Sequence, residues 1–276
     1  MKKNALTIDV EDYFQVSAFE HLVSKKSWET IKPRVDTNTY QLLELFNAKD
    51  AKATFFILGW VAQKYPELIQ RIADEGHEVA SHGMLHQRAS DQTQAEFKAD
   101  ISEAKKLLED ITGKAVIGYR APSFSFTKQN LWVYDSLAEA GYSYSSSVYP
   151  VVHDHYGIPD APRHRYTTES GVDEIPLSTL PLFGKNIPVS GGGYFRLYPY
   201  FVSHLAISRL LRPEEPNYIF YLHPWEIDPN QPRMDNISFK TRFRHYLNLK
   251  RVEKRLSRLL EDFEWESMST LYGYQS

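Results

Sequence analysis

Residues 54–81, TFFILGWVAQKYPELIQRIADEGHEVAS, decide the fold class of this chain. Residues 54–57 are β-branched and aromatic, which predicts a strand. The helical stretch after them is interrupted by Pro66, which suits the first position of a second helix that ends before Gly76. Residues 78–81 predict the next strand. This order of strand, helices and strand predicts a parallel α/β arrangement.

The same alternation extends in both directions. The stretch 94–112 is the clearest helix, because Phe97, Ile101 and Leu108 recur at helical spacing and Gly113 follows where a C-terminal cap belongs. The other predicted elements are a strand at 5–10, a helix at 39–47, a strand at 116–119, a helix at 131–140 and a strand at 142–148. Repeated units of this kind predict a parallel sheet or a barrel.

The second half of the chain is less regular. Residues 150–199 carry seven prolines, which predicts loops and short strands. A helix at 201–211, a strand at 218–222 and one long basic helix over 240–262 are predicted after them. Between Lys240 and Arg258 there are eight Lys and Arg against one Glu. This pattern indicates either an ordinary solvated face or a surface for anionic glycan, lipid headgroups or a protein of a biosynthetic machinery.

Composition excludes several classes of protein. The 276 residues carry 32 Lys and Arg against 35 Asp and Glu, a balance that argues against a nucleic acid partner. No run reaches the roughly 18 apolar residues of a transmembrane helix, and the first residues do not resemble a signal peptide, so we expect a cytoplasmic protein. Because there is no Cys, any metal must be bound by His and carboxylates.

Ionisable side chains follow the first predicted strands, and such strand ends gather on one face of a parallel sheet. Asp9, Glu11 and Asp12 close the strand at 5–10, and His82 and His86 follow the strand at 78–81. Two histidines four apart can face the same way on a helical turn. With one carboxylate they make a three-ligand metal site that leaves a position for water. Such pairs also arise by chance, and acids at strand ends are often only solvated.

Two further strand ends carry Arg120 and His223. An arginine on this face can pair with an acid and keep it ionised, and a histidine can exchange protons near neutral pH. Each signal is weak alone. Four strand ends that all present ionisable groups on one face are a stronger indication of a catalytic site.

The order of these motifs resembles that of the polysaccharide deacetylases, carbohydrate esterase family 4, which contain the NodB homology domain. The matching segments are Asp9 with its neighbouring acids, Ser81-His82-x-x-x-His86, Arg120-Ala121-Pro122 and Leu222-His223. Residues 7–14, 190–196 and 222–226 look more narrowly like the branch found in bacterial exopolysaccharide gene clusters. The resemblance implies a distorted (β/α) barrel as the catalytic domain over 1–226. It also implies a C-terminal helical extension over 227–276 that packs on the barrel.

The resemblance also implies roles for single residues. Asp9 matches the catalytic base, Arg120 the residue that orients the base, and His223 the general acid. His82 and His86 match the two metal-binding histidines.

One position departs from the family pattern. The family's second aspartate binds the metal, and Val10 stands in its place here and cannot ligate. Glu11 lies two residues after Asp9 and projects from the same side of an extended segment, which favours it as the substitute. Asp12 is the alternative, and it requires the chain to turn first.

Residues beside the motifs are the candidate contacts to substrate. The family implies a backbone N–H donor near Ser123 or Phe124, directly after Pro122. Tyr194 and Trp225 are aromatic candidates for a sugar face, although most aromatic side chains in a domain of this size fill the core.

The resemblance implies a metal-dependent hydrolase that removes N-acetyl groups from amino sugars of a polysaccharide, an oligosaccharide or a lipid-linked precursor. Imidazole and carboxylate ligands favour one zinc ion, and they also accept cobalt, nickel, manganese or ferrous iron. One alternative is hydrolysis of another amide by an allantoinase-like or peptidoglycan-acting protein. Another is a weakly active glycan-binding scaffold, which the Val10 replacement favours. The partners expected are an N-acetylated glycan and, weakly, a membrane or the biosynthetic machinery.

Overall fold

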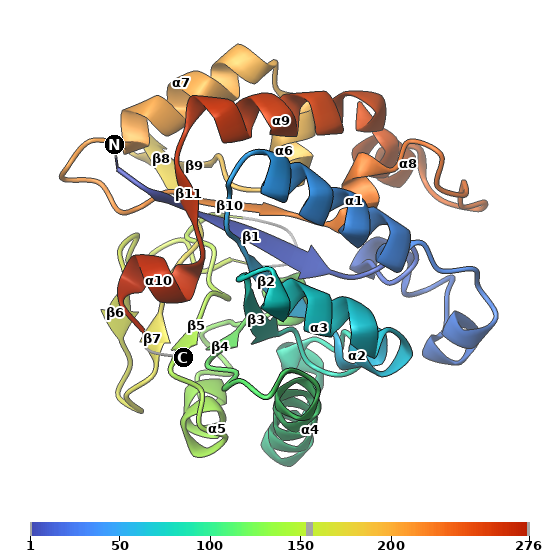
Figure 1. Cartoon of the computed structure of the whole chain (residues 1–276). Helices are drawn as coiled ribbons and strands as arrows, with labels where there is room; N and C mark the ends of the chain where they lie inside the picture. Colours follow the sequence, from blue (N-terminus) through green and yellow to red (C-terminus); the bar gives the residue numbers. More distant parts are fainter. Residues whose placement is uncertain (1, 153–156, 275–276) are drawn as a thin grey trace.

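The computed structural model describes residues 2–152 and 157–274 and shows an α/β fold built on one curled sheet (Figure 1). Among these residues nine strands form the sheet, in the order β10-β1-β2-β3-β4-β5-β7-β6, with β11 also paired to β1. The strands are β1 Asn4–Val10, β2 Thr54–Ile57, β3 Glu78–Ser81, β4 Gly118–Tyr119, β5 Tyr144–Ser145, β6 Tyr166–Thr167, β7 Asp173–Glu174, β10 Ile219–Leu222 and β11 Trp265–Glu266.

Neighbouring strands run parallel from β10 through β1, β2, β3, β4 and β5 to β7, and β6 joins β7 antiparallel at the edge. A separate hairpin consists of β8 (Thr179–Leu182) and β9 (Lys185–Pro188). The predicted distorted (β/α) barrel is therefore confirmed as a curled and mostly parallel sheet, with β10 and β6 at the two ends of the strand order.

Helices lie around the outside of the curled sheet, α1 to α5 along one part and α7 and α9 along another (Figure 1). Apolar faces such as Leu42, Leu43 and Phe46 of α1 are buried in the core. The helices are α1 Val35–Ala48, α2 Gly59–Lys64, α3 Pro66–Asp74, α4 Gln94–Thr112, α5 Val133–Glu139, α6 Gly192–Leu197, α7 Tyr200–Leu210, α8 Phe239–Tyr246, α9 Val252–Asp262 and α10 Met268–Tyr272. No helix in the described ranges combines the length and the apolar character needed to cross a bilayer.

The best-predicted elements have strong local signals. β2, β3 and α4 have the predicted bounds, and α4 begins with a capping box of Thr93 and Glu96 and ends at Gly113 with φ 65°. The strand predicted at 142–148 is too long. The N–H groups of Ser147 and Val148 donate to the side-chain carboxylate of Glu174 in β7 instead of to a backbone carbonyl of a neighbouring strand, so β5 is only two residues long.

The single basic helix predicted over 240–262 is wrong. The chain forms α8, a short 3-10 helix at Leu249–Arg251, and α9, with Asn248 between them in the left-handed region at φ 54°. Asparagine tolerates this conformation better than most residues. Its side-chain amide donates to the carbonyl oxygen of Arg196 at 2.8 Å, which holds the break in place.

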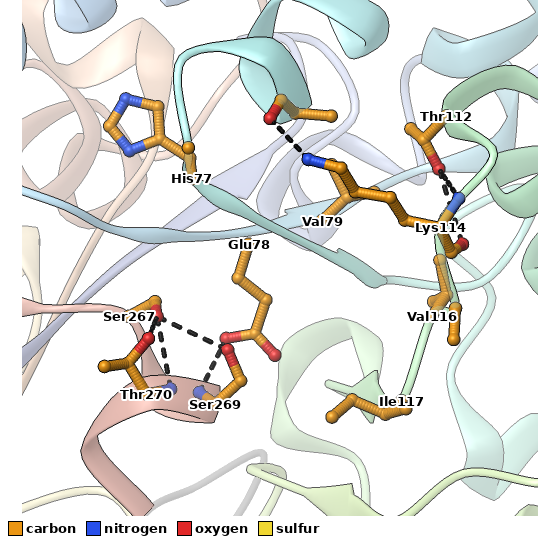
Figure 2. Close-up of a pocket in the computed structure, with 13 residues that line it drawn as sticks. His77, Glu78, Val79, Thr112, Lys114, Val116, Ile117, Ser267, Ser269 and Thr270 are labelled. Carbon is orange, nitrogen blue, oxygen red and sulfur yellow. Dashed lines mark hydrogen bonds between the residues drawn. The ribbon is translucent and has the colours of Figure 1, made fainter. Parts of the chain in front are cut away.

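The C-terminal segment joins the amino end of the sheet. β11 pairs with β1, the Met268 N–H donates to Thr54 Oγ1 at 2.8 Å, and the Ser269 N–H donates to Glu78 Oε2 at 2.8 Å. Figure 2 shows Glu78 pointing toward this segment across a small pocket of about 160 Å³. Residues 264–273 thus share the sheet of the region before them, and the domain division after residue 226 stays a prediction.

Candidate metal and catalytic site

The strand ends meet at the carboxyl edge of the sheet, as the sequence predicted. β1 pairs with β2 on one side and β10 on the other, and β3 and β4 continue in parallel register. This register brings Asp9, His82, Arg120 and His223 to one edge although they lie far apart in the sequence. The mostly parallel topology therefore assembles the site.

Glu11, His82 and His86 form a compact group that can hold a metal ion. One ligand atom from each lies within 4.8 Å of the other two, and His86 Nε2 is 2.6 Å from Glu11 Oε2. Glu11 Oε2 is buried and, apart from this close contact with His86, accepts no hydrogen bond among the described residues. Two imidazoles and a buried carboxylate fit a divalent cation.

Charge keeps Glu11 ionised in spite of its burial. Burial alone raises the pKa of Glu11, but the charge and the hydrogen bond of His86, followed by the charge of His223, outweigh it and lower the pKa. An ionised carboxylate is the form that binds a cation.

A backbone contact fixes the tautomer of His82. Its Nδ1 lies 2.8 Å from the carbonyl oxygen of Arg120, which can only accept, so Nδ1 carries the hydrogen and Nε2 keeps a lone pair. Burial is the main cause that lowers the pKa of His82 to about 3, and the charge of His86 adds to it. His82 is therefore a neutral imidazole suited to ligation.

The two histidines are carried by a loop and not by the helical turn that their spacing would also suit. Residues 82–86 take no helical form, and His86 has φ 51°. Gly83 adopts φ 76°, and the Asp100 carboxylate of α4 accepts the Met84 N–H at 3.2 Å. This geometry brings the imidazole rings to 5.4 Å between centroids without a helix.

The structure separates the two candidate carboxylates. Asp12 points away from the histidines, and its oxygens accept the N–H groups of Tyr13, Arg34 and Val35 at 2.6–2.9 Å, at the start of α1. Burial raises its pKa to about 6 against these hydrogen bonds. Asp12 thus stabilises the loop before α1, and Glu11 is the carboxylate beside the histidines.

Asp9 is held by a fully buried arginine. Arg120 Nη1 lies 2.7 Å from Asp9 Oδ1 and donates to Thr7 Oγ1 at 2.8 Å, while its Nε donates to the carbonyl oxygen of Ser146 at 3.0 Å. This network fixes one carboxylate oxygen of Asp9. The sequence predicted Arg120 in this position but gave no signal for Thr7 or Ser146.

His223 faces the acids from β10. Its Nε2 lies 3.4 Å from Glu11 Oε1 and 4.0 Å from Asp9 Oδ2, and its Nδ1 lies 2.8 Å from Glu226 Oε1. Burial alone lowers the pKa of His223, but the hydrogen bond to Glu226 and the charges of the three carboxylates raise it to about 9.

Glu226 is a candidate functional residue to which the sequence analysis assigned no role. Burial favours its neutral form, but Arg196, whose Nε lies 2.7 Å from Glu226 Oε2, and His223 lower the pKa of Glu226 to about 2. The three residues form a chain of alternating charge that favours the protonated form of His223. The position three residues after His223 was the only signal in the sequence.

Trp225 packs between two imidazoles. Its ring stacks on His223 at 5.3 Å and on His245 of α8 at 4.2 Å between centroids. The Trp225 ring therefore packs mainly against these two imidazoles and supports the side of the cleft that carries His223.

Gly191 and Gly192, at the start of α6, allow this helix to approach Glu226 closely. A Cβ at Gly192 overlaps the Glu226 carboxylate, a Cβ at Gly191 overlaps the Tyr221 ring, and Gly191 has φ 93°. Close approach of other side chains therefore requires glycine at positions 191 and 192.

We expect Gly192→Ala to destabilise the protein by about 1–3 kcal/mol, because the new methyl group displaces Glu226. The displacement also weakens the contact between Glu226 and His223. Gly193→Ala is the matched control, since nothing lies within 4 Å of a Cβ there. Thermal unfolding of both variants measures the difference. Equal melting temperatures for the two variants contradict this account of Glu226.

A strained turn lies opposite the metal group. Ser123 and Phe124 both have positive φ, 57° and 50°. The Phe124 N–H donates to the carbonyl oxygen of Ala121 at 3.0 Å, whereas no residue in the described ranges accepts the Ser123 N–H. Of the two predicted backbone donors, Ser123 is thus the one left for a ligand.

A cleft of about 650 Å³ joins these groups, and Ser123, Phe124 and Trp225 line it, while their contact with substrate stays a prediction. Among the described residues, Pro122 and Tyr194 do not line the cleft; Pro122 is buried and Tyr194 stacks on Tyr198. The remaining lining residues are Asp9, Glu11, Val16, Ser17, Ala18, Glu20, His21, His82, His86, Arg88, Arg196, Tyr221, His223, Lys240, Thr241, Arg244 and His245.

Two family models match the chain. Residues 27–144 match the model described as polysaccharide deacetylase, and residues 146–273 match a domain of unknown function, DUF3473. The two matches meet near residue 145.

Curated relatives with named activities are similar to part of the chain. A peptidoglycan-N-acetylglucosamine deacetylase of Bacillus cereus is 34% identical over 106 residues, which are 38% of this chain and 48% of the relative. A chitooligosaccharide deacetylase of Azorhizobium caulinodans is 31% identical over 108 residues, 39% of this chain and 51% of the relative. The chain thus spans about half the length of these relatives.

Solved structures share the fold. A candidate polysaccharide deacetylase from Mycobacterium smegmatis has a TM-score of 0.61 at 17% identity, and the match covers 99% of this chain and 90% of that chain. A carbohydrate esterase family 4 pseudoenzyme from Bacillus anthracis has a TM-score of 0.51 at 16% identity, and the match covers 98% of this chain and 65% of that chain. At these identities the likeness shows the fold alone.

Proposed function

Because residues 27–144 match the polysaccharide deacetylase family, we propose that this chain hydrolyses the N-acetyl groups of amino sugars in a glycan, releasing acetate and a free amine. The observation that carries the proposal is the convergence of Glu11, His82 and His86 beside Asp9 and His223 in one cleft. No single strand end supplies this set of groups.

Glu11, His82 and His86 would hold a divalent cation, with zinc the first choice for these ligands. Such an ion, when bound, supplies a more acidic water molecule and polarises a carbonyl oxygen. Val10 is fully buried in the core, and Glu11 provides the carboxylate that the family pattern places at the Val10 position. The replacement therefore gives little support to an inactive scaffold.

Asp9 would accept the proton of the attacking water. Its Oδ1 is held by Arg120, so Oδ2 faces the cleft on the side of His223, 4.0 Å from Nε2. The Ser123 N–H would donate to the carbonyl oxygen as negative charge develops on it, a contact worth about 3–4 kcal/mol in comparable sites.

His223 would donate a proton to the departing amine. Its hydrogen bond to Glu226 maintains the protonated form needed for that step above the usual pKa of histidine. Arg196 keeps Glu226 ionised, so the acid is positioned and charged by residues that do not touch the substrate carbonyl.

We expect Glu226→Gln to move the alkaline limb of kcat/KM to lower pH. The acid must be protonated, activity is lost as pH rises through the pKa of His223, and removing the Glu226 charge lowers that pKa. The measurement is the pH profile of acetate release for wild type and variant. An unchanged alkaline limb means that His223 is not the acid.

Chelation tests the proposed function directly. We expect acetate release from N-acetylglucosamine oligomers to stop when the bound metal is removed and to return when zinc is added. Cyclic amides and peptidoglycan fragments assayed in parallel separate the alternative amide substrates. Activity that survives complete removal of metal contradicts the proposal.

We also propose three finer assignments that rest on sequence patterns alone. They are the exopolysaccharide branch of the family, a weak association with a membrane or the biosynthetic machinery, and a cytoplasmic location.

A further inference from the structure

One wall of the cleft is formed by α8, a helix without an acidic residue. Lys240, Thr241 and Arg244 of this helix line the cleft. Arg244 is exposed, and its guanidinium makes no hydrogen bond or ion pair with the part of the chain that the structure describes. A positive charge therefore faces the substrate space.

The other lining charges already have partners. Asp9 pairs with Arg120, and Glu11 contacts His86. Further charged pairs of the lining are Arg88 with Glu20 at 2.9 Å and Arg196 with Glu226 at 2.7 Å, and His223 faces Glu11 and Glu226. None of the lining carboxylates neutralises Arg244.

The backbone at Arg244 is held in place relative to the proposed acid. Arg196 Nη1 donates to the carbonyl oxygens of Arg244 and His245 at 3.0 and 2.7 Å, while the same guanidinium holds Glu226. His245 stacks on Trp225, and Trp225 stacks on His223. The end of α8 thus belongs to the His223 side of the cleft, where the amine would leave.

We propose that the cleft selects an N-acetylated glycan that also carries a negative charge, a carboxylate or a phosphate, bound by Arg244 on the amine side of the reacting sugar. This inference rests on the proposed function and specifies its substrate. A guanidinium donates two parallel hydrogen bonds to either anion, which a neutral sugar hydroxyl cannot match.

Binding to the full chain with chelator present tests the inference without turnover. Calorimetry compares the neutral tetramer of N-acetylglucosamine with a tetrasaccharide that alternates N-acetylglucosamine and glucuronate, and with uridine diphosphate N-acetylglucosamine. We expect at least one charged ligand to bind about fivefold or more tightly than the neutral tetramer, or about 1 kcal/mol. The two charged ligands distinguish a carboxylate source from a phosphate source.

Arg242 provides a matched control, because it is exposed on α8 and does not line the cleft. Arg244→Glu is expected to remove the preference for the charged ligand, and Arg242→Glu, with the same change in net charge, is expected to keep it. Equal weakening by both variants assigns the effect to the general charge of α8, as for docking on an anionic surface, and overturns the cleft site.

The inference and the proposed function fail in different ways. Equal affinity for neutral and charged ligands, or no binding of either charged ligand, overturns the inference even when the metal-loaded protein releases acetate from neutral oligomers. A preference for charged ligands that depends on Arg244, found together with no acetate release from any ligand, supports the anion site and rejects the deacetylase.

Discussion

Asp9→Asn is expected to reduce acetate release by about 10²–10⁴-fold while the metal content of the protein stays unchanged. The carboxylate is the proposed proton acceptor and lies outside the group of Glu11, His82 and His86. An amide of the same shape keeps the place of the side chain but cannot accept the proton. Steady-state kinetics and metal analysis of the same preparation measure the two effects.

Stability must be measured beside activity, because Asp9 pairs with buried Arg120. Breaking such a pair can cost about 3–5 kcal/mol. Thr7→Val is the matched control, since it removes another acceptor of the same guanidinium without touching the proposed base. Asp9→Asn protein that is folded, metal-bound and fully active contradicts the role of Asp9.

Glu11→Ala is expected to weaken metal binding by more than about 100-fold and to abolish activity with it. The reason is that this carboxylate completes the group with the two histidines, and even residues behind metal ligands contribute about 10–100-fold. His82→Ala and His86→Ala are expected to have the same effect. Metal content after dialysis, followed by titration with zinc, measures the loss.

Asp12→Ala is the matched control for Glu11. It should keep the metal and instead lower stability by about 1–3 kcal/mol, because three backbone N–H groups lose their acceptor. The reverse pattern, with metal lost in Asp12→Ala and kept in Glu11→Ala, contradicts the assignment.

The sequence predicted the sheet well because its signals are local. Residues 54–57 and 78–81 have a clear strand pattern, and the capping box and Gly113 delimit α4. Once the strands are parallel, their carboxyl ends must gather, so the grouping of Asp9, His82, Arg120 and His223 followed from topology.

The sequence failed where a distant contact decides the local form. Asn248 breaks the predicted long helix because its side chain reaches Arg196, and the His82–His86 segment bends through residues with positive φ, not as a helical turn. The helical spacing of residues over 240–262 contains no information about such contacts between distant parts of the chain. The break matters, since it is what sets α8 against the cleft.

The roles of the residues that support the site could not be predicted from the sequence either. Thr7, Ser146 and Arg196 are ordinary polar residues in their local context, and only the fold shows that they hold Asp9 and His223 through Arg120 and Glu226. The choice between Glu11 and Asp12 likewise depended on which carboxylate the N–H groups before α1 occupy.

The most direct test of the central claim is anomalous diffraction at the zinc absorption edge from crystals of the full chain grown with zinc. The account predicts one strong peak between Glu11, His82 and His86, within reach of Asp9 and His223. The absence of a peak there, or a peak ligated by Asp12 with Glu11 turned away, contradicts it.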